Sequence, residues 1–125
     1  MAKAIPDAIL DKTLDEIATA TKQVLCSAQP TTYTEANSTY ALADIVIDGS
    51  DFTKANGDTS GRKVTISAQS GVLIDTSGTG THIALVRTAD STLIYVTTCT
   101  SQAVTANGSN TVNMPAWKIE LADPA

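Results

Sequence analysis

The side chains of this chain that are able to do acid–base or nucleophilic chemistry are few and far apart. There is one histidine, His82, and there are two cysteines, Cys26 and Cys99. No GxSxG segment marks an activated serine, so a catalytic relay through His82 would have to be assembled in space. These three side chains are also too few for a structural zinc site. We therefore expect no catalytic residues, no metal, no cofactor and no enzymatic activity.

The two cysteines have two interpretations. A disulfide between them would close a long loop and stabilise the fold by about 4 kcal/mol. A reducing cytoplasm would instead keep both thiols free. Cys26 lies in the run VLCS and Cys99 in VTTCT, and a free cysteine in such a run behaves as a small buried hydrophobe. Free thiols are the favoured interpretation.

Polar side chains cluster around a glycine-rich segment in the middle of the chain, at Asp48, Asp51, Asn56 and Asp58. An EF-hand calcium loop places oxygen ligands at alternate positions and ends on a bidentate glutamate, and the spacing here differs. The run SGTGT at 77–81 lacks the third glycine and the lysine of phosphate-binding loops. Both segments are interpreted as turns.

Aromatic residues are the remaining candidates for a binding site. The chain has one tryptophan, three tyrosines and one phenylalanine. Trp117 together with Tyr33, Tyr40 and Tyr95 would make an aromatic platform for a sugar. With so few aromatic residues available, packing in the core is the more economical use of Trp117.

The strongest structural signal is the stretch 81–100, THIALVRTADSTLIYVTTCT. Two runs rich in Val, Ile, Leu, Tyr and Thr flank the polar tetrad 88–91. This pattern predicts two antiparallel strands joined by a tight turn. The hairpin is the element around which we expect the other strands to be arranged.

One convincing helix is predicted, over residues 5–22. Pro6 suits the first helical position, and the apolar residues fall on one face, opposite a charged face. That apolar face either packs on the domain's own sheet or docks into a neighbouring subunit. The four residues that form this candidate interface are Ile9, Leu10, Leu14 and Ile17.

Short strands follow the helix at intervals of roughly 8 to 14 residues, separated by turn signals. They are predicted at 22–27, 41–48, 63–69, 71–75, in the two arms of the hairpin with an extension to 104, at 111–114 and at 116–122. A long loop is predicted at 28–39, and a loop or a distorted hairpin at 49–62. The expected fold is mainly β, a β-sandwich or jelly-roll-like domain of about eight short strands. The whole chain, 1–125, is expected to form this single domain, with the helix at 5–22 and the sandwich at 23–122.

Composition restricts the possible partners. Eight basic and thirteen acidic residues give a net charge of −5, which disfavours nucleic acid, because phosphate binding depends on Lys and Arg. An acidic surface also discourages contact with anionic membranes. No apolar run is long enough to span a bilayer, and the segment 1–10 lacks the apolar core of a signal peptide. We expect the protein to be made in a cytoplasm.

Three stretches carry a resemblance that spans nearly the whole chain: 4–36 (AIPDAILDKTLDEIATATKQVLCSAQPTTYTEA), 50–66 (SDFTKANGDTSGRKVTI) and 113–124 (NMPAWKIELADP). They resemble a family of small structural proteins of tailed bacteriophages. The resemblance implies a location in the virion, as a capsid decoration or cement protein. The alternative that it implies is a tail-associated accessory protein or a receptor- or glycan-recognition module.

A β-domain with few charges and many Thr and Ala residues is suited to lateral packing in a lattice, since small side chains lose little entropy in a contact. The expected partners are therefore other copies of the chain, as a trimer or another symmetric homo-oligomer, and virion proteins such as the major capsid protein.

Overall fold

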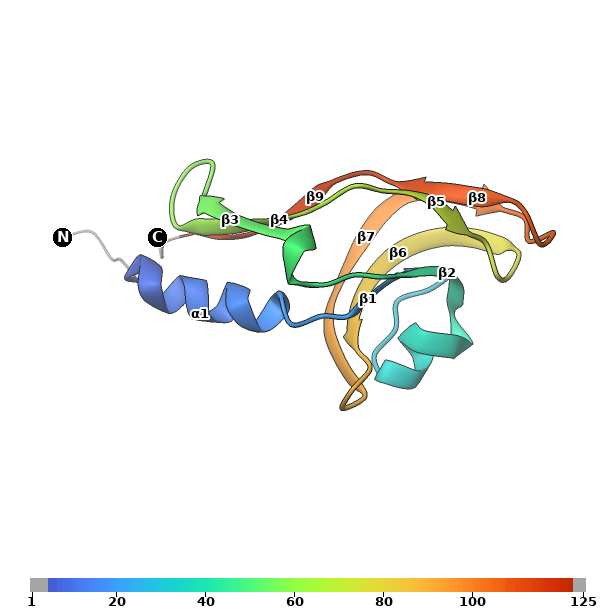
Figure 1. Cartoon of the computed structure of the whole chain (residues 1–125), viewed down its shortest axis with the longest axis horizontal. Helices are drawn as coiled ribbons and strands as arrows, with labels where there is room; N and C mark the ends of the chain where they lie inside the picture. The colour runs from blue at the N-terminus through green and yellow to red at the C-terminus, as the bar shows by residue number, and fades with distance from the viewer. Residues whose placement is uncertain (1–4, 123–125) are drawn as a thin grey trace.

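The structure is a computed structural model, and it describes residues 5–122. Within these residues one α-helix precedes nine strands, all paired in antiparallel fashion (Figure 1). The predicted fold class is confirmed, because the fold is mainly β and sandwich-like with an N-terminal helix. The strands are β1 (Lys22–Cys26), β2 (Ala41–Val46), β3 (Phe52–Asn56), β4 (Arg62–Ile66), β5 (Gln69–Leu73), β6 (Gly78–Arg87), β7 (Thr92–Val104), β8 (Thr111–Met114) and β9 (Trp117–Leu121).

The predicted hairpin forms the centre of the largest sheet. In the described part of the chain this sheet has four strands in the order β2-β1-β6-β7. Strands β6 and β7 are joined by residues 88–91, the tetrad expected to turn, and Ser91 there has a φ of 55°. The extension to 104 is also confirmed, because β7 ends at Val104.

Alternation along the strands divides the apolar residues of this sheet between its two faces. Leu25 of β1 lies opposite Ile83 of β6, and both pack in one cluster with residues of β2, β5 and β8. Val24 lies opposite Ala84, and these two pack on the other face, in a second cluster that includes Ala36 of the connection between β1 and β2. Both faces of the central sheet are therefore covered.

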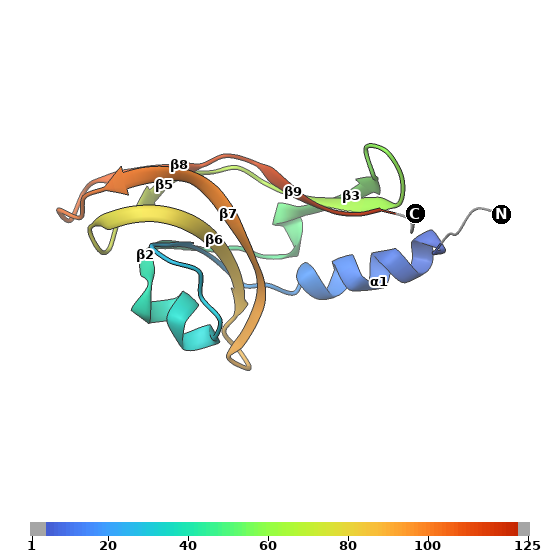
Figure 2. The ribbon, with the colours of Figure 1, turned by 180° about the vertical axis from the view of Figure 1, so that it is seen from behind.

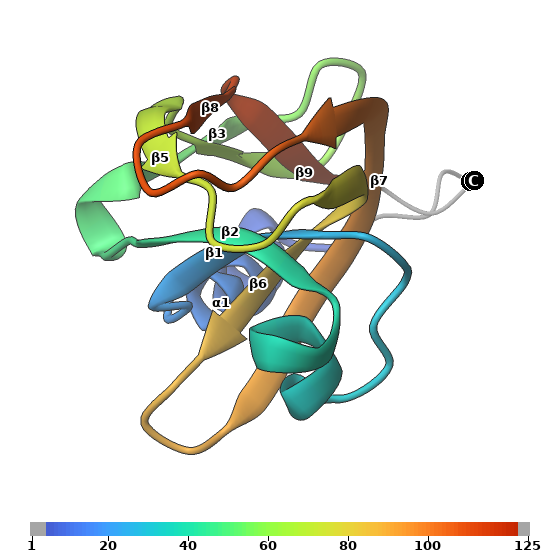
Figure 3. The same cartoon turned by 90° about the vertical axis from the view of Figure 1, so that its right-hand side faces the viewer.

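The second layer is a long ribbon that runs past the central sheet. It consists of the three-stranded sheet β3-β4-β9 and the two-stranded sheet β5-β8. Figures 1 and 3 show β5 and β8 over the central sheet, whereas β3, β4 and β9 extend beyond it and lie over the helix α1 (Asp7–Ile17). The helix thus takes the place of a second sheet at that end of the ribbon.

The helix is shorter than predicted. It covers Asp7–Ile17 rather than 5–22, with Pro6 one position before it and Ala18 as its C-terminal cap. The hydroxyl of Thr19 donates to the carbonyl of Glu16, a local bond by which a threonine competes with helical pairing. The chain then enters β1 at Lys22, so the predicted strand at 22–27 begins where expected.

Regular structure occurs in the predicted loop 28–39 and in the segment 49–62, predicted as a loop or a distorted hairpin. The hairpin alternative is confirmed for the second segment, because β3 pairs with β4 in antiparallel fashion. The segment 28–39 ends in a π-helical turn, η1 (Glu35–Thr39), and 49–62 contains a short 3-10 turn, η2 (Gly49–Asp51), followed by β3. The η1 turn is stabilised locally, because Glu35 accepts hydrogen bonds from both the backbone and the hydroxyl of Thr31. These bonds lower the pKa of Glu35 below its usual value.

Among residues 5–122, no helix has the length and apolar character needed to cross a membrane.

Candidate functional site

The four interface candidates of the helix differ in their exposure. Leu10, Leu14 and Ile17 are buried, and Ile9 is 53% exposed. Leu14 and Ile17 belong to the same apolar cluster as Val64 of β4, so this side of the helix packs on the protein's own sheet, the first of the two alternatives. Ile9 is the member of the set that remains on the surface, available to a neighbour.

The outer side of β7 is an open strand edge. In the described structure β7 pairs with β6 and ends the order β2-β1-β6-β7, and Figure 2 shows it outermost, in front of β6. Its thirteen residues, TLIYVTTCTSQAV, include no charged residue and no proline. We call the unpaired side of Thr92–Val104 the β7 edge.

The opposite edge of the same sheet is covered. The backbone N–H groups of Asp75 and Thr76 both donate to the carbonyl of Leu42 in β2, and Ala43 forms a bridge with Ile74. The segment between β5 and β6 therefore caps β2. The two edges of the central sheet differ in that β2 is protected by the chain itself and β7 is not.

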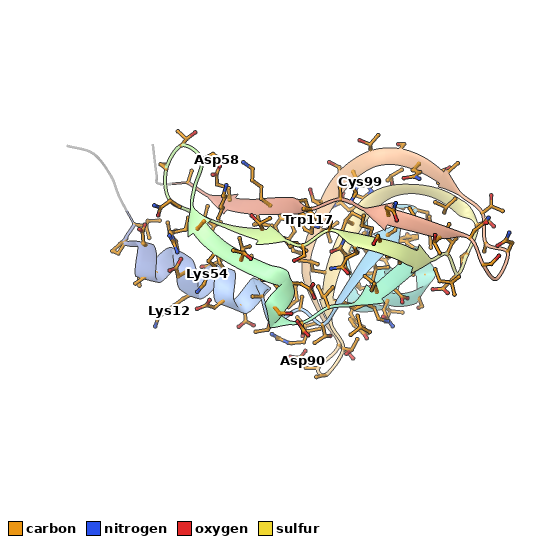
Figure 4. The ribbon with its side chains drawn as sticks, turned by 45° about the horizontal axis from the view of Figure 1, so that its top comes forward. Lys12, Lys54, Asp58, Asp90, Cys99 and Trp117 are labelled. Atoms are coloured by element: carbon orange, nitrogen blue, oxygen red, sulfur yellow. The ribbon has the colours of Figure 1, made fainter. Side chains whose placement is uncertain are left out.

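A groove of about 450 Å³ lies between the β7 edge and the ribbon. One wall consists of residues 97–100 of β7, and the other of residues 112–118, from β8 into β9; Gln23, Leu25 and Ile83 of the central sheet lie at its base. We call this the Trp117 groove. Figure 4 shows Cys99 and Trp117, which lie on β7 and β9 and belong to opposite walls.

Two buried polar atoms of the groove residues have no hydrogen-bond partner within residues 5–122. They are Oε1 of Gln23 and Nε1 of Trp117. Gln23 is completely buried, and its amide nitrogen donates to the sulfur of Met114, at 3.1 Å. Gln23 and Trp117 both line the groove, and they bring to it a buried acceptor from one layer of the fold and a buried donor from the other.

Core packing of Trp117, the interpretation favoured over an aromatic platform, is confirmed, because Trp117 packs against two core clusters. Tyr95 and Trp117 have ring centroids 5.9 Å apart, tilted by 31°. Tyr33 and Tyr40 pack instead against the cluster that contains Val24, on the other face of the central sheet. A four-residue platform is therefore wrong, and the indole of Trp117 has Tyr95 as its aromatic neighbour.

Both cysteines are free thiols in the structure, as favoured from the sequence. Cys26 is buried beside Val24, while Cys99 is partly exposed and packs against the cluster on the other face of the sheet. Burial raises the pKa of Cys26 to about 12 and also raises that of Cys99. Neither thiol has the lowered pKa of a reactive nucleophile.

His82 is not part of a relay among the described residues. Its Nδ1 lies 2.8 Å from the hydroxyl of the adjacent Thr81. No ion pair joins it to a carboxylate in this part of the chain, and it is not among the residues of the Trp117 groove.

The acidic residues of the central loop have structural partners. Asp48 and Asp51 form a reciprocal capping box around η2, in which Asp48 also accepts from Ser50 and has a lowered pKa. Asp58 pairs with Lys63, at 2.7 Å, and with Lys118. No group of three or more His, Cys, Asp or Glu side chains able to hold a metal ion occurs between residues 5 and 122.

Sequence analysis did not single out Gln23, although the pattern of β1 contained a signal. In KQVLC the glutamine is two residues from Leu25 and shares its face of the strand, because side chains alternate. A single uncharged polar residue on a core-facing side is a candidate for a buried hydrogen-bonding role.

Comparison with protein-family models, curated proteins and solved structures found no match to this chain.

Proposed function

We propose that the protein is a non-enzymatic structural protein of a bacteriophage virion, of the decoration or cement type, which joins neighbouring subunits through the β7 edge. The assignment to a virion rests on the sequence resemblance over 4–36, 50–66 and 113–124. The observation that carries the assembly role is the long, unprotected edge of β7.

A free strand edge offers unpaired N–H and C=O groups along its length and pairs readily with another chain. Monomeric proteins protect such edges with lysines, prolines, short strands or a covering segment. Strand β7 has thirteen residues, none charged and none proline, whereas β2 is capped by the segment that contains Asp75 and Thr76. The contrast within one sheet supports a partner strand at β7.

The side chains along this edge suit repeated contacts. Residues 97–101 read TTCTS, and Thr98, Thr100 and Ser101 are exposed. Short hydroxyl side chains contribute hydrogen bonds with a small loss of conformational entropy, so the cost of ordering them in an interface is low.

Pairing through the β7 edge is compatible with a symmetric oligomer. Two β7 edges that pair with each other make an isologous contact, which gives a pair, and a β7 edge that pairs with a different surface of the next copy makes a heterologous contact, which closes into a ring when the rotation permits. Such contacts generate the proposed trimer or other symmetric homo-oligomer, and the completed oligomer would bind the major capsid protein.

A Ser101→Lys variant tests the edge. A lysine on an edge strand opposes pairing with another chain, so we expect the oligomer measured by size-exclusion chromatography with light scattering to dissociate, and binding to purified capsids in co-sedimentation to fall. The matched control is Thr59→Lys, in the exposed connection between β3 and β4, which adds the same charge away from β7.

Two outcomes would overturn the proposal. One is a wild-type protein that stays monomeric and does not sediment with capsids of the phage that encodes it. The other is a Ser101→Lys variant that assembles and binds capsids as well as Thr59→Lys does.

A further inference from the structure

The Trp117 groove has features of a ligand site that the proposed assembly role does not require. Its volume of about 450 Å³ falls within the range of small-molecule sites. It is lined by apolar side chains such as Leu25, Ile83 and Val112, and by six uncharged polar ones. This mixture is typical of sites that hold a small molecule by contact area and orient it by a few hydrogen bonds.

The two unpartnered atoms specify what a ligand must offer. Buried polar groups in folded proteins are normally hydrogen-bonded, and an unsatisfied one is unfavourable. Oε1 of Gln23 requires a donor and Nε1 of Trp117 requires an acceptor. A hydroxyl group is both donor and acceptor, so a molecule rich in hydroxyl groups is able to satisfy both atoms.

The other polar groups of the groove indicate a neutral ligand. They are hydroxyls and amides, on Thr97, Thr98, Thr100, Gln102 and Asn113. The single charged residue of the lining is Lys118, and its ammonium group is paired with Asp58. A ligand with a net charge would therefore lack a counterion among the lining residues, whereas neutral hydroxyls match the groups that are present.

The indole of Trp117 adds a flat apolar surface. Trp117 is partly buried, since it packs against two core clusters and its ring lies 5.9 Å from that of Tyr95, and its N–H is a buried polar tip. An aromatic ring with such a tip is suited to a partner that is apolar on one side and hydrogen-bonding at its rim. A sugar ring has this character, since it carries C–H groups on its faces and hydroxyls around its edge.

We propose that the Trp117 groove binds a neutral, hydroxyl-rich ligand the size of one or two sugar rings. Gln23 accepts a hydrogen bond from a ligand hydroxyl, Trp117 donates one to it, and the indole face packs against the ring. This inference does not depend on the proposed assembly role, and it places the site at Gln23 and Trp117.

The chain is well suited to a direct test, because Trp117 is its only tryptophan and its fluorescence reports on the groove alone. Glucose, galactose, N-acetylglucosamine and maltose would be titrated into the full chain. We expect a saturable change with at least one of them, with a dissociation constant of about 1 mM for a ligand of that size. Amide NMR shifts should concentrate at residues 97–100 and 112–118.

Gln23→Leu and Trp117→Phe are the diagnostic variants, with binding followed by NMR because the second lacks the fluorophore. Each removes one of the two polar atoms and keeps an apolar side chain, so each should weaken binding by roughly tenfold. Gln69→Leu is the matched control, since Gln69 bonds to Asp51 and Ser67 and is not part of the groove. NMR spectra of the free variants establish that they are folded.

Three results would overturn the inference. The first is that none of the four sugars gives a saturable response, even at concentrations 100-fold above the expected dissociation constant of about 1 mM. The second is binding that Gln23→Leu and Trp117→Phe leave unchanged. The third is a saturable response to the uncharged peptide acetyl-Thr-Val-Thr-amide with none to the sugars, which would assign the groove to an extended polypeptide instead.

Discussion

The side-chain amide of Gln23 donates a hydrogen bond to the sulfur of Met114, with 3.1 Å between the nitrogen and the sulfur. The bond connects β1 of the central sheet with β8 of the ribbon. A thioether is a weak acceptor, and the oxygen of the same amide has no partner among the described residues. Burying Gln23 in the unliganded protein therefore opposes folding.

Gln23→Leu is expected to stabilise the unliganded protein. Replacement of a buried polar group that lacks a partner removes its desolvation penalty, and we expect the free energy of unfolding to rise by about 1 kcal/mol. Urea denaturation followed by circular dichroism measures this. Gln69→Leu loses hydrogen bonds that are made and should give no gain. A loss of stability in Gln23→Leu comparable to a core truncation would contradict the expectation.

Leu14→Ala is expected to destabilise the monomer. Leu14 is completely buried between the helix and β4, and truncation of a buried leucine leaves a cavity that costs about 3 kcal/mol. Ile9→Ala, at the same helix but 53% exposed, should change the free energy of unfolding by no more than about 0.5 kcal/mol. Thermal unfolding of both variants tests whether the apolar face of the helix packs on the protein's own sheet. Equal effects would contradict its intramolecular packing.

The variants Gly61→Ala and Gly71→Ala separate two costs to the free energy of unfolding at positions of positive φ. One is backbone strain, and the other is steric overlap of the new methyl group. The φ angles are 69° and 67°, so each substitution should cost about 1 kcal/mol from the backbone alone. A Cβ at Gly61 would overlap the carbonyl oxygen of Leu121, while nothing lies within 4 Å of a Cβ at Gly71. We therefore expect Gly61→Ala to cost roughly 2 kcal/mol more, measured by urea denaturation. If both variants lose the same stability, β9 moves away from the new methyl group at position 61 without a cost, and the expectation is contradicted.

Arg87→Gln is expected to alter stability in acid. The guanidinium of Arg87 bonds to both carboxylate oxygens of Asp90, each at 2.9 Å, and this lowers the pKa of Asp90 from its ordinary value of 3.8. A lowered pKa in the folded state stabilises the protein above pH 3.8, and this contribution disappears as the pH falls through the folded value. The variant should therefore lose less stability below pH 3.8 than the wild type.

The direct measurement is an NMR titration that follows the chemical shift of the side-chain carboxyl carbon of Asp90 against pH. The pKa of Asp90 should be higher in Arg87→Gln than in the wild type. Asp48 is an internal control, because its pKa is lowered by Ser50 rather than by Arg87 and should not change. An unchanged titration of Asp90 would contradict the assignment of Arg87 as the cause.

The sequence predicted most strands because they follow local rules. The hairpin with its turn at 88–91 was correct, and so was the last strand, where Ile119 is buried and Trp117 half-buried on the same face. Strand β3 was left open between a loop and one arm of a distorted hairpin, because FTKAN lacks alternation: it has one apolar anchor, Phe52, and four exposed residues after it. Its strand conformation comes from pairing with β4, a tertiary contact.

The groove was not predictable from the sequence. Its walls, 97–100 and 112–118, are strands that pair with other partners, β6 on one side and β5 and β4 on the other. How far two such strands separate depends on how both layers pack. A strand pattern carries no information on that distance, so Gln23 was not singled out. The interpretation of Trp117 as a residue that packs with the core is confirmed, because it packs against two core clusters.

Residues 97–100 belong both to the β7 edge and to one wall of the Trp117 groove. A subunit paired with the edge and a molecule in the groove would therefore act on the same four residues, and their binding free energies would be coupled. Thermodynamic reciprocity requires that each changes the affinity of the other by the same factor. The groove's affinity for its ligand would then report whether a subunit is free or incorporated in a lattice.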